Sequence, residues 1–150
     1  MDDFDFILSS GVWEGKGKIS FSASPAQLDF TTRWEIEPLQ GGIVRAYQIV
    51  EISELEKQIN RFVFHEIKEG SFAVQLHNDL LGKISGEGLY TAESMIWEYF
   101  PNQLLEGFEF YRLSEKGKHL FHAEYGISSS FGTLIDGMIY RLEETSPPTQ

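Results

Sequence analysis

The sequence lacks cysteine and is poor in basic residues. Its 150 residues include no Cys, which excludes disulfide scaffolds, thiolate chemistry and cysteine-ligated zinc. There are 12 Lys and Arg against 23 Asp and Glu, so the formal net charge of −11 disfavours binding to nucleic acid or to an anionic membrane surface. No apolar run is long enough to span a membrane, and the acidic start MDDFD differs from the basic start of a signal peptide. We therefore expect a cytoplasmic protein without membrane insertion.

Familiar catalytic and metal-binding motifs are also missing. The sequence has no G-x-S-x-G elbow, no H-E-x-x-H pair and no phosphate-binding P-loop. His119 and His122 form an H-x-x-H pattern, but residues three apart on a strand point to opposite faces and cannot chelate one metal. We predict no catalytic residue set and no metal site.

Aromatic residues are abundant, and apolar residues alternate with polar ones. The 12 Phe, 6 Tyr and 3 Trp indicate a chain that folds around a ring-rich core. Alternation is clearest over residues 27–37, where Phe30 and Trp34 share one face while acidic and basic side chains occupy the other. This period of two predicts an all-β protein.

The spacing of these runs predicts a barrel. Ten strands are expected, at residues 11–21, 27–37, 42–52, 57–67, 71–77, 83–90, 94–100, 106–113, 118–125 and 133–143. Short links rich in turn-forming residues separate them, so sequence neighbours pair antiparallel. A meander of this length favours closure into an up-and-down β-barrel over residues 11–143, with a helical plug at 1–10 and a flexible tail at 144–150.

A short motif points to a family of barrels. Gly11-Val12-Trp13-Glu14-Gly15-Lys16-Gly17 resembles the opening strand of the calycin superfamily, which includes lipocalins, fatty-acid-binding proteins and the nitrobindin-like group. Those barrels close with a basic residue packed over the opening Trp, and Arg141 on the last predicted strand matches it. The resemblance implies a calycin-like barrel in which Trp13 and Arg141 form a structural cation–π pair.

The resemblance also bears on cofactors. Proteins like nitrobindin bind haem through a His close to the C-terminus, whereas the last histidine here is His122. We therefore predict no cofactor. Haem or another tetrapyrrole stays an option, but no histidine lies at the position where it would ligate the iron.

Extending the alternation to other strands predicts a ligand site inside the barrel. The side chains expected to point inward and bind a ligand are Phe30, Trp34, Arg45, Tyr47, Trp97, Phe108, Phe110, Arg112, His119, Phe121 and Tyr125. An arginine on an apolar face needs a partner, which the carboxylate or phosphate of an amphipathic ligand would supply. Alternatively, Arg45 and Arg112 reach the barrel mouth, or pair with interior acids such as Glu51 or Asp136.

Three functions are compatible with these features. The first is binding of a small hydrophobic or amphipathic, anionic ligand. The second is an interaction module whose acidic surface engages a basic protein partner. The third is an enzyme that uses His119 or His65 as acid/base, assisted by Tyr125 or Tyr111. The sequence favours ligand binding most, the interaction module second and the enzyme least. It leaves the oligomeric state open.

Overall fold

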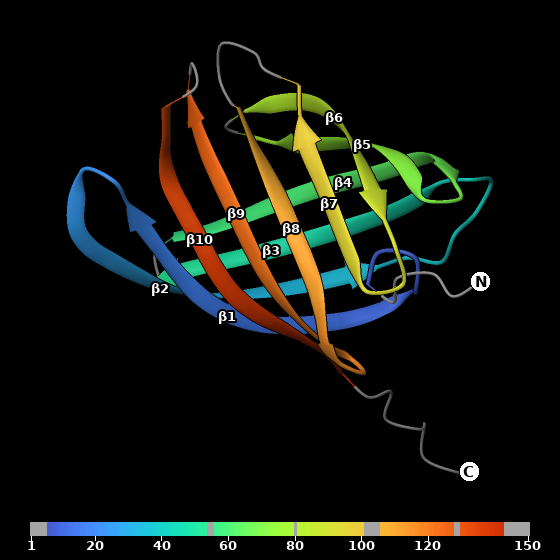
Figure 1. Cartoon of the computed structure of the whole chain (residues 1–150), viewed down its shortest axis with the longest axis horizontal. Helices are drawn as coiled ribbons and strands as arrows, with labels where there is room; N and C mark the ends of the chain where they lie inside the picture. The colour runs from blue at the N-terminus through green and yellow to red at the C-terminus, as the bar shows by residue number, and fades with distance from the viewer. Residues whose placement is uncertain (1–5, 54–55, 80, 101–105, 128–129, 143–150) are drawn as a thin grey trace.

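Ten antiparallel strands close into one up-and-down barrel in the computed structural model (Figure 1). The structure describes residues 6–53, 56–79, 81–100, 106–127 and 130–142. The strands are β1 (Gly11–Phe21), β2 (Ser24–Ile36), β3 (Val44–Ser53), β4 (Glu56–Lys68), β5 (Ser71–Asn78), β6 (Gly82–Tyr90), β7 (Ser94–Tyr99), β8 (Glu106–Glu115), β9 (Lys118–Ile127) and β10 (Ser130–Arg141). Each strand pairs with its neighbours in the chain, and β1 pairs with β10. The predicted fold class is confirmed, and closure leaves no strand edge unpaired.

Glycines allow the seam between β1 and β10 to close. A Cβ atom added at Gly15 would lie 2.1 Å from the carbonyl oxygen of Met138, and one added at Gly17 would lie 2.3 Å from that of Asp136. From the other strand, a Cβ at Gly137 would meet the carbonyl oxygen of Lys16 at 2.5 Å. Any larger residue would push the two strands apart, so these glycines serve the close approach of backbones.

The N-terminal segment covers one end of the barrel, which we call the closed end. Residues 6–9 form a turn rather than the predicted helix, and no helix occurs in the part of the chain that the structure describes. Phe6 and Ile7 are nevertheless buried, with 0% and 1% of their surface exposed. The ring of Phe6 lies 5.4 Å from that of Trp13 and 5.1 Å from that of Trp34. Residues 1–5 of the plug predicted at 1–10, and the tail predicted at 144–150, lie outside the described residues.

The prediction of which side chains point inward is right for some strands and wrong for β3. On β2, Phe30 and Trp34 are buried as expected. On β3, Val44 and Ala46 point into the core, whereas Arg45 and Tyr47 are exposed. Both faces of this strand carry apolar residues, so the alternation alone does not fix the register. Pairing with β4 does, because it sets Ala46 opposite the buried Phe62.

The inward face of β8 is also opposite to the prediction. Glu109 and Tyr111 are buried inside the barrel, with 5% and 1% exposure. Phe108 and Phe110 lie half-buried on the outer wall, and Arg112 is exposed there. An acid therefore occupies the interior while two phenylalanines pack outside. There, Phe110 is paired with Ile96 of β7. Burial of the acid is tolerable because neighbouring hydroxyl groups hydrogen-bond it.

Candidate functional site

A cavity of about 200 Å³ occupies the half of the barrel away from the closed end, which we call the open half. Its lining is mainly apolar: Ile19, Phe30, Val50, Ile52, Phe62, Leu76, Leu81, Tyr111, Phe121, Ala123, Tyr125 and Ile135, together with Gln48, Gln58, Asn60, Asn78 and Glu109. These residues come from β1 to β5 and β8 to β10, with Leu81 just before β6, because successive antiparallel strands bring alternate ends to one side.

Aromatic rings form the floor of the cavity. Tyr111 and Phe121 are stacked with ring centroids 5.6 Å apart, and Trp97 stacks on Tyr111 at 5.2 Å. Phe62 packs on Trp34 at 4.9 Å. Beneath these rings lie Phe6 and the closed end, so the cavity stops near the middle of the barrel.

The polar centre of the cavity is Glu109 on β8. The hydroxyl of Tyr99 donates a hydrogen bond to its Oε2 atom at 2.6 Å, and the hydroxyl of Tyr111 donates to Oε1 at 3.0 Å. The indole Nε1–H of Trp97 donates in turn to the hydroxyl oxygen of Tyr99 at 2.9 Å. Phenol groups from β7 and β8 thus donate hydrogen bonds to a buried carboxylate. We call Glu109, Tyr99, Tyr111, Tyr125 and Trp97 the Glu109 cluster.

Burial and hydrogen bonding act on these groups in opposite directions. Burial raises the pKa of Glu109, and hydrogen bonds from Tyr125, Tyr99 and Tyr111 offset part of that rise. Burial and the nearby negative charge of Glu109 raise the pKa of all three tyrosines well above its usual value. The tyrosines therefore keep their protons and act as hydrogen-bond donors.

A row of side-chain amides lines the opposite wall. Gln48 Nε2 donates to Thr32 Oγ1 at 3.2 Å, and Asn60 Nδ2 donates to Gln48 Oε1 at 2.9 Å. Asn78 Nδ2 then donates to Asn60 Oδ1 at 3.1 Å. The row crosses β2 to β5 and provides neutral polar atoms to the cavity, so its main effect is to satisfy polar groups inside an apolar barrel.

The structure gathers only part of the predicted site. Phe30, Phe121 and Tyr125 line the cavity, and Trp34 and Trp97 lie in the core beside it. The five residues placed wrongly on β3 and β8, namely Arg45, Tyr47, Phe108, Phe110 and Arg112, lie on the outer wall and not in the cavity. No Lys, Arg or His is among the described residues that line it. The interior arginines that suggested an anionic ligand are therefore absent from this cavity.

The histidines lie away from the cavity. His119 is buried at the closed end, 5.1 Å from the ring of Trp13, whereas His122 lies on the outer wall, so the prediction of opposite faces is confirmed. His65 directly follows the inward-pointing Phe64 on β4, so its side chain points outward. Tyr125 and Tyr111 line the cavity, whereas His119 and His65, the two histidines considered as acid/base, are not among its described lining residues.

The predicted contact between Trp13 and Arg141 is present. The two residues are directly paired across β1 and β10, and the guanidinium carbon lies 5.9 Å from the indole centroid. The guanidinium also donates to the backbone oxygen of Ser10. Arg141 thereby ties the last strand to the segment that covers the closed end.

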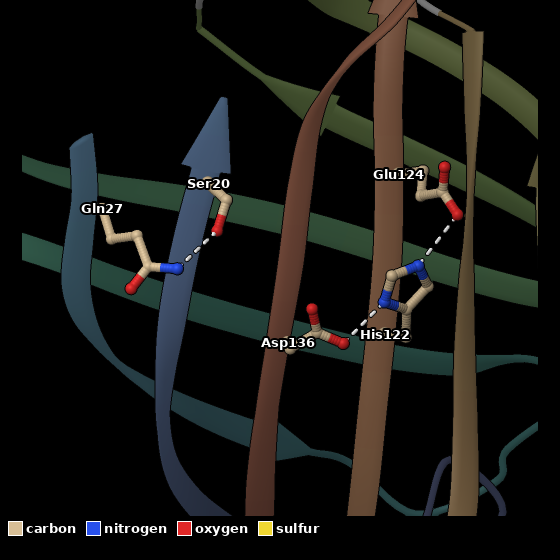
Figure 2. Close-up of polar contacts among 5 residues, drawn as sticks. All are labelled: Ser20, Gln27, His122, Glu124 and Asp136. Atoms are coloured by element: carbon tan, nitrogen blue, oxygen red, sulfur yellow. Dashed lines mark hydrogen bonds and ion pairs between the residues drawn. The ribbon is translucent and has the colours of Figure 1, made fainter. Parts of the chain in front are cut away.

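A second polar group lies on the outer wall, as Figure 2 shows. His122 Nδ1 is 2.6 Å from Asp136 Oδ1, and its Nε2 is 2.9 Å from Glu124 Oε2. Burial lowers the pKa of His122, but the two carboxylates outweigh it and the pKa is raised overall. Both ring nitrogens are used by carboxylates, and no cluster suited to a metal occurs among the described residues. This group links β9 to β10.

Comparisons with known proteins agree on the fold. No family model and no curated protein matches this sequence. The chain is similar to the crystal structure of Rv2717c from M. tuberculosis, with a TM-score of 0.70 and 10% identity over 89% of this chain and 92% of that one. It is also similar to the S-type phycobiliprotein lyase CPES from Guillardia theta, with a TM-score of 0.63 and 12% identity over 93% of this chain and 90% of that one.

A third similar structure is EF1p2_mFAP2b bound to DFHBI, with a TM-score of 0.50 and 12% identity over 90% of this chain and 94% of that one. The likeness is one of fold. Together with the closed ring of ten strands, it supports an all-β, up-and-down barrel fold. Within the described residues no helix is long and apolar enough to cross a membrane.

Proposed function

We propose that the protein binds a small molecule of about one ring inside the open half of the barrel, with a hydrogen-bond donor of the ligand facing the Glu109 cluster. The observation behind this proposal is the cavity of about 200 Å³ that has aromatic walls and a buried carboxylate on its lining. Concave, mostly apolar sites with a few convergent polar groups are typical of ligand-binding sites.

Cavity size supports a small ligand. A cavity of about 150 Å³ lined by apolar side chains is enough to bind benzene, and this one is about 200 Å³. A tetrapyrrole is larger than this cavity. We therefore propose that the protein binds a smaller ligand and holds no resident cofactor. One similar structure is a phycobiliprotein lyase and another, EF1p2_mFAP2b, is bound to DFHBI, which supports small-molecule binding by a chain of this fold.

The polar groups of the cavity support a ligand that donates hydrogen bonds. Glu109 offers carboxylate oxygens, and no cationic side chain is among the described residues of the lining to receive an anion. This proposal replaces the anionic ligand expected from Arg45 and Arg112. A cytoplasmic location and the absence of membrane insertion remain part of it.

Filling the cavity tests the proposal. Ala123 lines the cavity next to Glu109 on the neighbouring strand, so an Ala123→Leu substitution would occupy the space that the ligand needs. Calorimetric titration with benzyl alcohol should show binding to the wild type and none to the variant. Ala73→Leu is the matched control, because Ala73 lies on the outer wall and should leave binding unchanged. Equal binding by Ala123→Leu and the wild type would place benzyl alcohol elsewhere and contradict the proposal.

A further inference from the structure

The hydrogen-bond partners of Glu109 suit one form of its carboxyl group. The hydroxyl oxygen of Tyr99 accepts the indole N–H of Trp97, so its own proton is directed to Glu109 Oε2. Tyr111 donates to the other oxygen, Oε1. Because both oxygens receive protons from neutral donors, the arrangement suits an ionised carboxylate, which accepts hydrogen bonds and donates none.

Among the described residues that line the cavity, this carboxylate has hydrogen-bond donors but no positive partner. The described lining residues include phenols, amides and apolar side chains, and none of them is a Lys, Arg or His. A buried charge without a counter-charge is costly, and neutral donors compensate only part of that cost. A cation entering the cavity would complete the pairing. The rings of Phe30, Phe121 and Tyr111 around it would add cation–π attraction.

We infer that the ligand of this cavity is a small organic cation, in which an ammonium or amidinium group pairs with Glu109 while an apolar ring packs against the aromatic walls. This inference rests on the ligand binding proposed above and specifies the class of ligand. The pKa of Glu109 is raised by burial, so a bound cation, which favours the ionised form, lowers it again. Affinity for a cation should therefore increase as the pH rises through that pKa.

Three probes of nearly equal size test the inference on the wild-type protein. Benzylamine is a cation at pH 7, benzyl alcohol is neutral and benzoate is an anion. We expect benzylamine to bind about tenfold more tightly than benzyl alcohol, since a charge-assisted hydrogen bond is about twice as strong as a neutral one. Benzoate should show no binding. This ranking needs no variant, so it stands even if a substitution disturbs folding.

Two variants locate the effect. Glu109→Gln keeps the size of the side chain and removes its charge, so the preference for benzylamine over benzyl alcohol should fall to about one. Glu98→Gln, on the exposed face of β7, removes one charge from the outer wall and should leave the preference unchanged. Circular dichroism checks that both variants fold.

The outcomes distinguish the two proposals. If benzyl alcohol and benzylamine bind equally to the wild type, the cation is wrong and the ligand cavity stands. If neither binds, the proposed function fails and the inference with it. If the preference for benzylamine disappears when the salt concentration is raised, attraction to the acidic surface explains it and the inference is overturned, because a buried pair is screened much less.

Discussion

The two halves of the barrel are built differently although the same strands run through both. At the closed end, Phe6, Trp13 and Trp34 are each 0% exposed, and their rings meet at distances near 5 Å. In the open half, a cavity of about 200 Å³ separates the walls, and polar side chains face it. One end is filled by apolar rings, and the other keeps space together with a carboxylate.

This difference suggests how the fold divides its tasks. Close packing of rings at the closed end supplies free energy of folding, which depends on apolar surface removed from water. A cavity costs free energy of folding because its lining lacks neighbours. The open half therefore contributes less to the free energy of folding because it contains a cavity. The closed end contributes more and stabilises the barrel.

Truncating the ring that plugs the closed end should have the largest effect. Phe6→Ala removes edge-to-face contacts with Trp13 and Trp34 in a fully packed region, so we expect a loss of about 3–5 kcal/mol in the free energy of unfolding. Phe30→Ala is the matched change in the open half, where the ring borders the cavity, and should cost less. Urea denaturation measures both. Equal losses would show that the two halves are packed alike.

Removing one phenol from the Glu109 cluster should have an intermediate effect. Tyr99→Phe leaves the N–H of Trp97 without its acceptor and deprives Glu109 of a donor, so we expect a loss of about 1–3 kcal/mol. Tyr140→Phe is the control, because Tyr140 is 42% exposed on the outer wall and water can replace its contacts. The same urea experiment compares them, and an unchanged stability of Tyr99→Phe would mean that the cluster does not support the open half.

The smallest effect should come from the outer wall, which belongs to neither half. The pKa of folded His122 is raised above its ordinary value of 6.5, because Glu124 and Asp136 outweigh burial. A group with a raised pKa stabilises the fold fully below the pKa of the unfolded chain, and that contribution is lost as the pH rises through the folded pKa. The stability difference between wild type and His122→Gln should therefore shrink from pH 5.5 to pH 8.5.

Thermal unfolding at the two pH values measures this difference. His77→Gln, on the exposed face of β5, is the control for removal of a histidine. A difference that grows with pH would reverse the sign and contradict the role of the two carboxylates.

Much of the fold follows from the sequence, and less of the site does. Alternation and turn residues predict all ten strands, and the four apolar residues that alternate over residues 28–36 (Leu28, Phe30, Trp34 and Ile36) indicate which face of β2 points inward. On β8 the same reasoning fails, because Phe108 and Phe110 on one face are matched by Tyr111 and Leu113 on the other, so apolar residues do not distinguish the faces. Register there is decided by pairing with β7 and β9, and the alternation within one strand does not contain that information.

Glu109 escapes sequence reasoning for the same reason. An acid between two phenylalanines reads as a solvent-facing residue, whereas the structure buries it among hydroxyl groups. A signal exists in the tyrosines, since Tyr99, Tyr111 and Tyr125 on three successive strands all need a hydrogen-bond partner when they are buried. Three buried hydroxyl groups that each need a partner indicate a common hydrogen-bond acceptor. This can be inferred only after the strands have been placed in register.

The most direct test follows the indole N–H signals of Trp97 and Trp13 by two-dimensional NMR during titration with benzyl alcohol. Trp97 belongs to the Glu109 cluster, while Trp13 lies in the packed closed end. We predict that the Trp97 signal shifts in a saturable manner and that the Trp13 signal stays in place. A Trp97 signal that does not move, or equal shifts of both, would contradict the account of a ligand cavity confined to the open half.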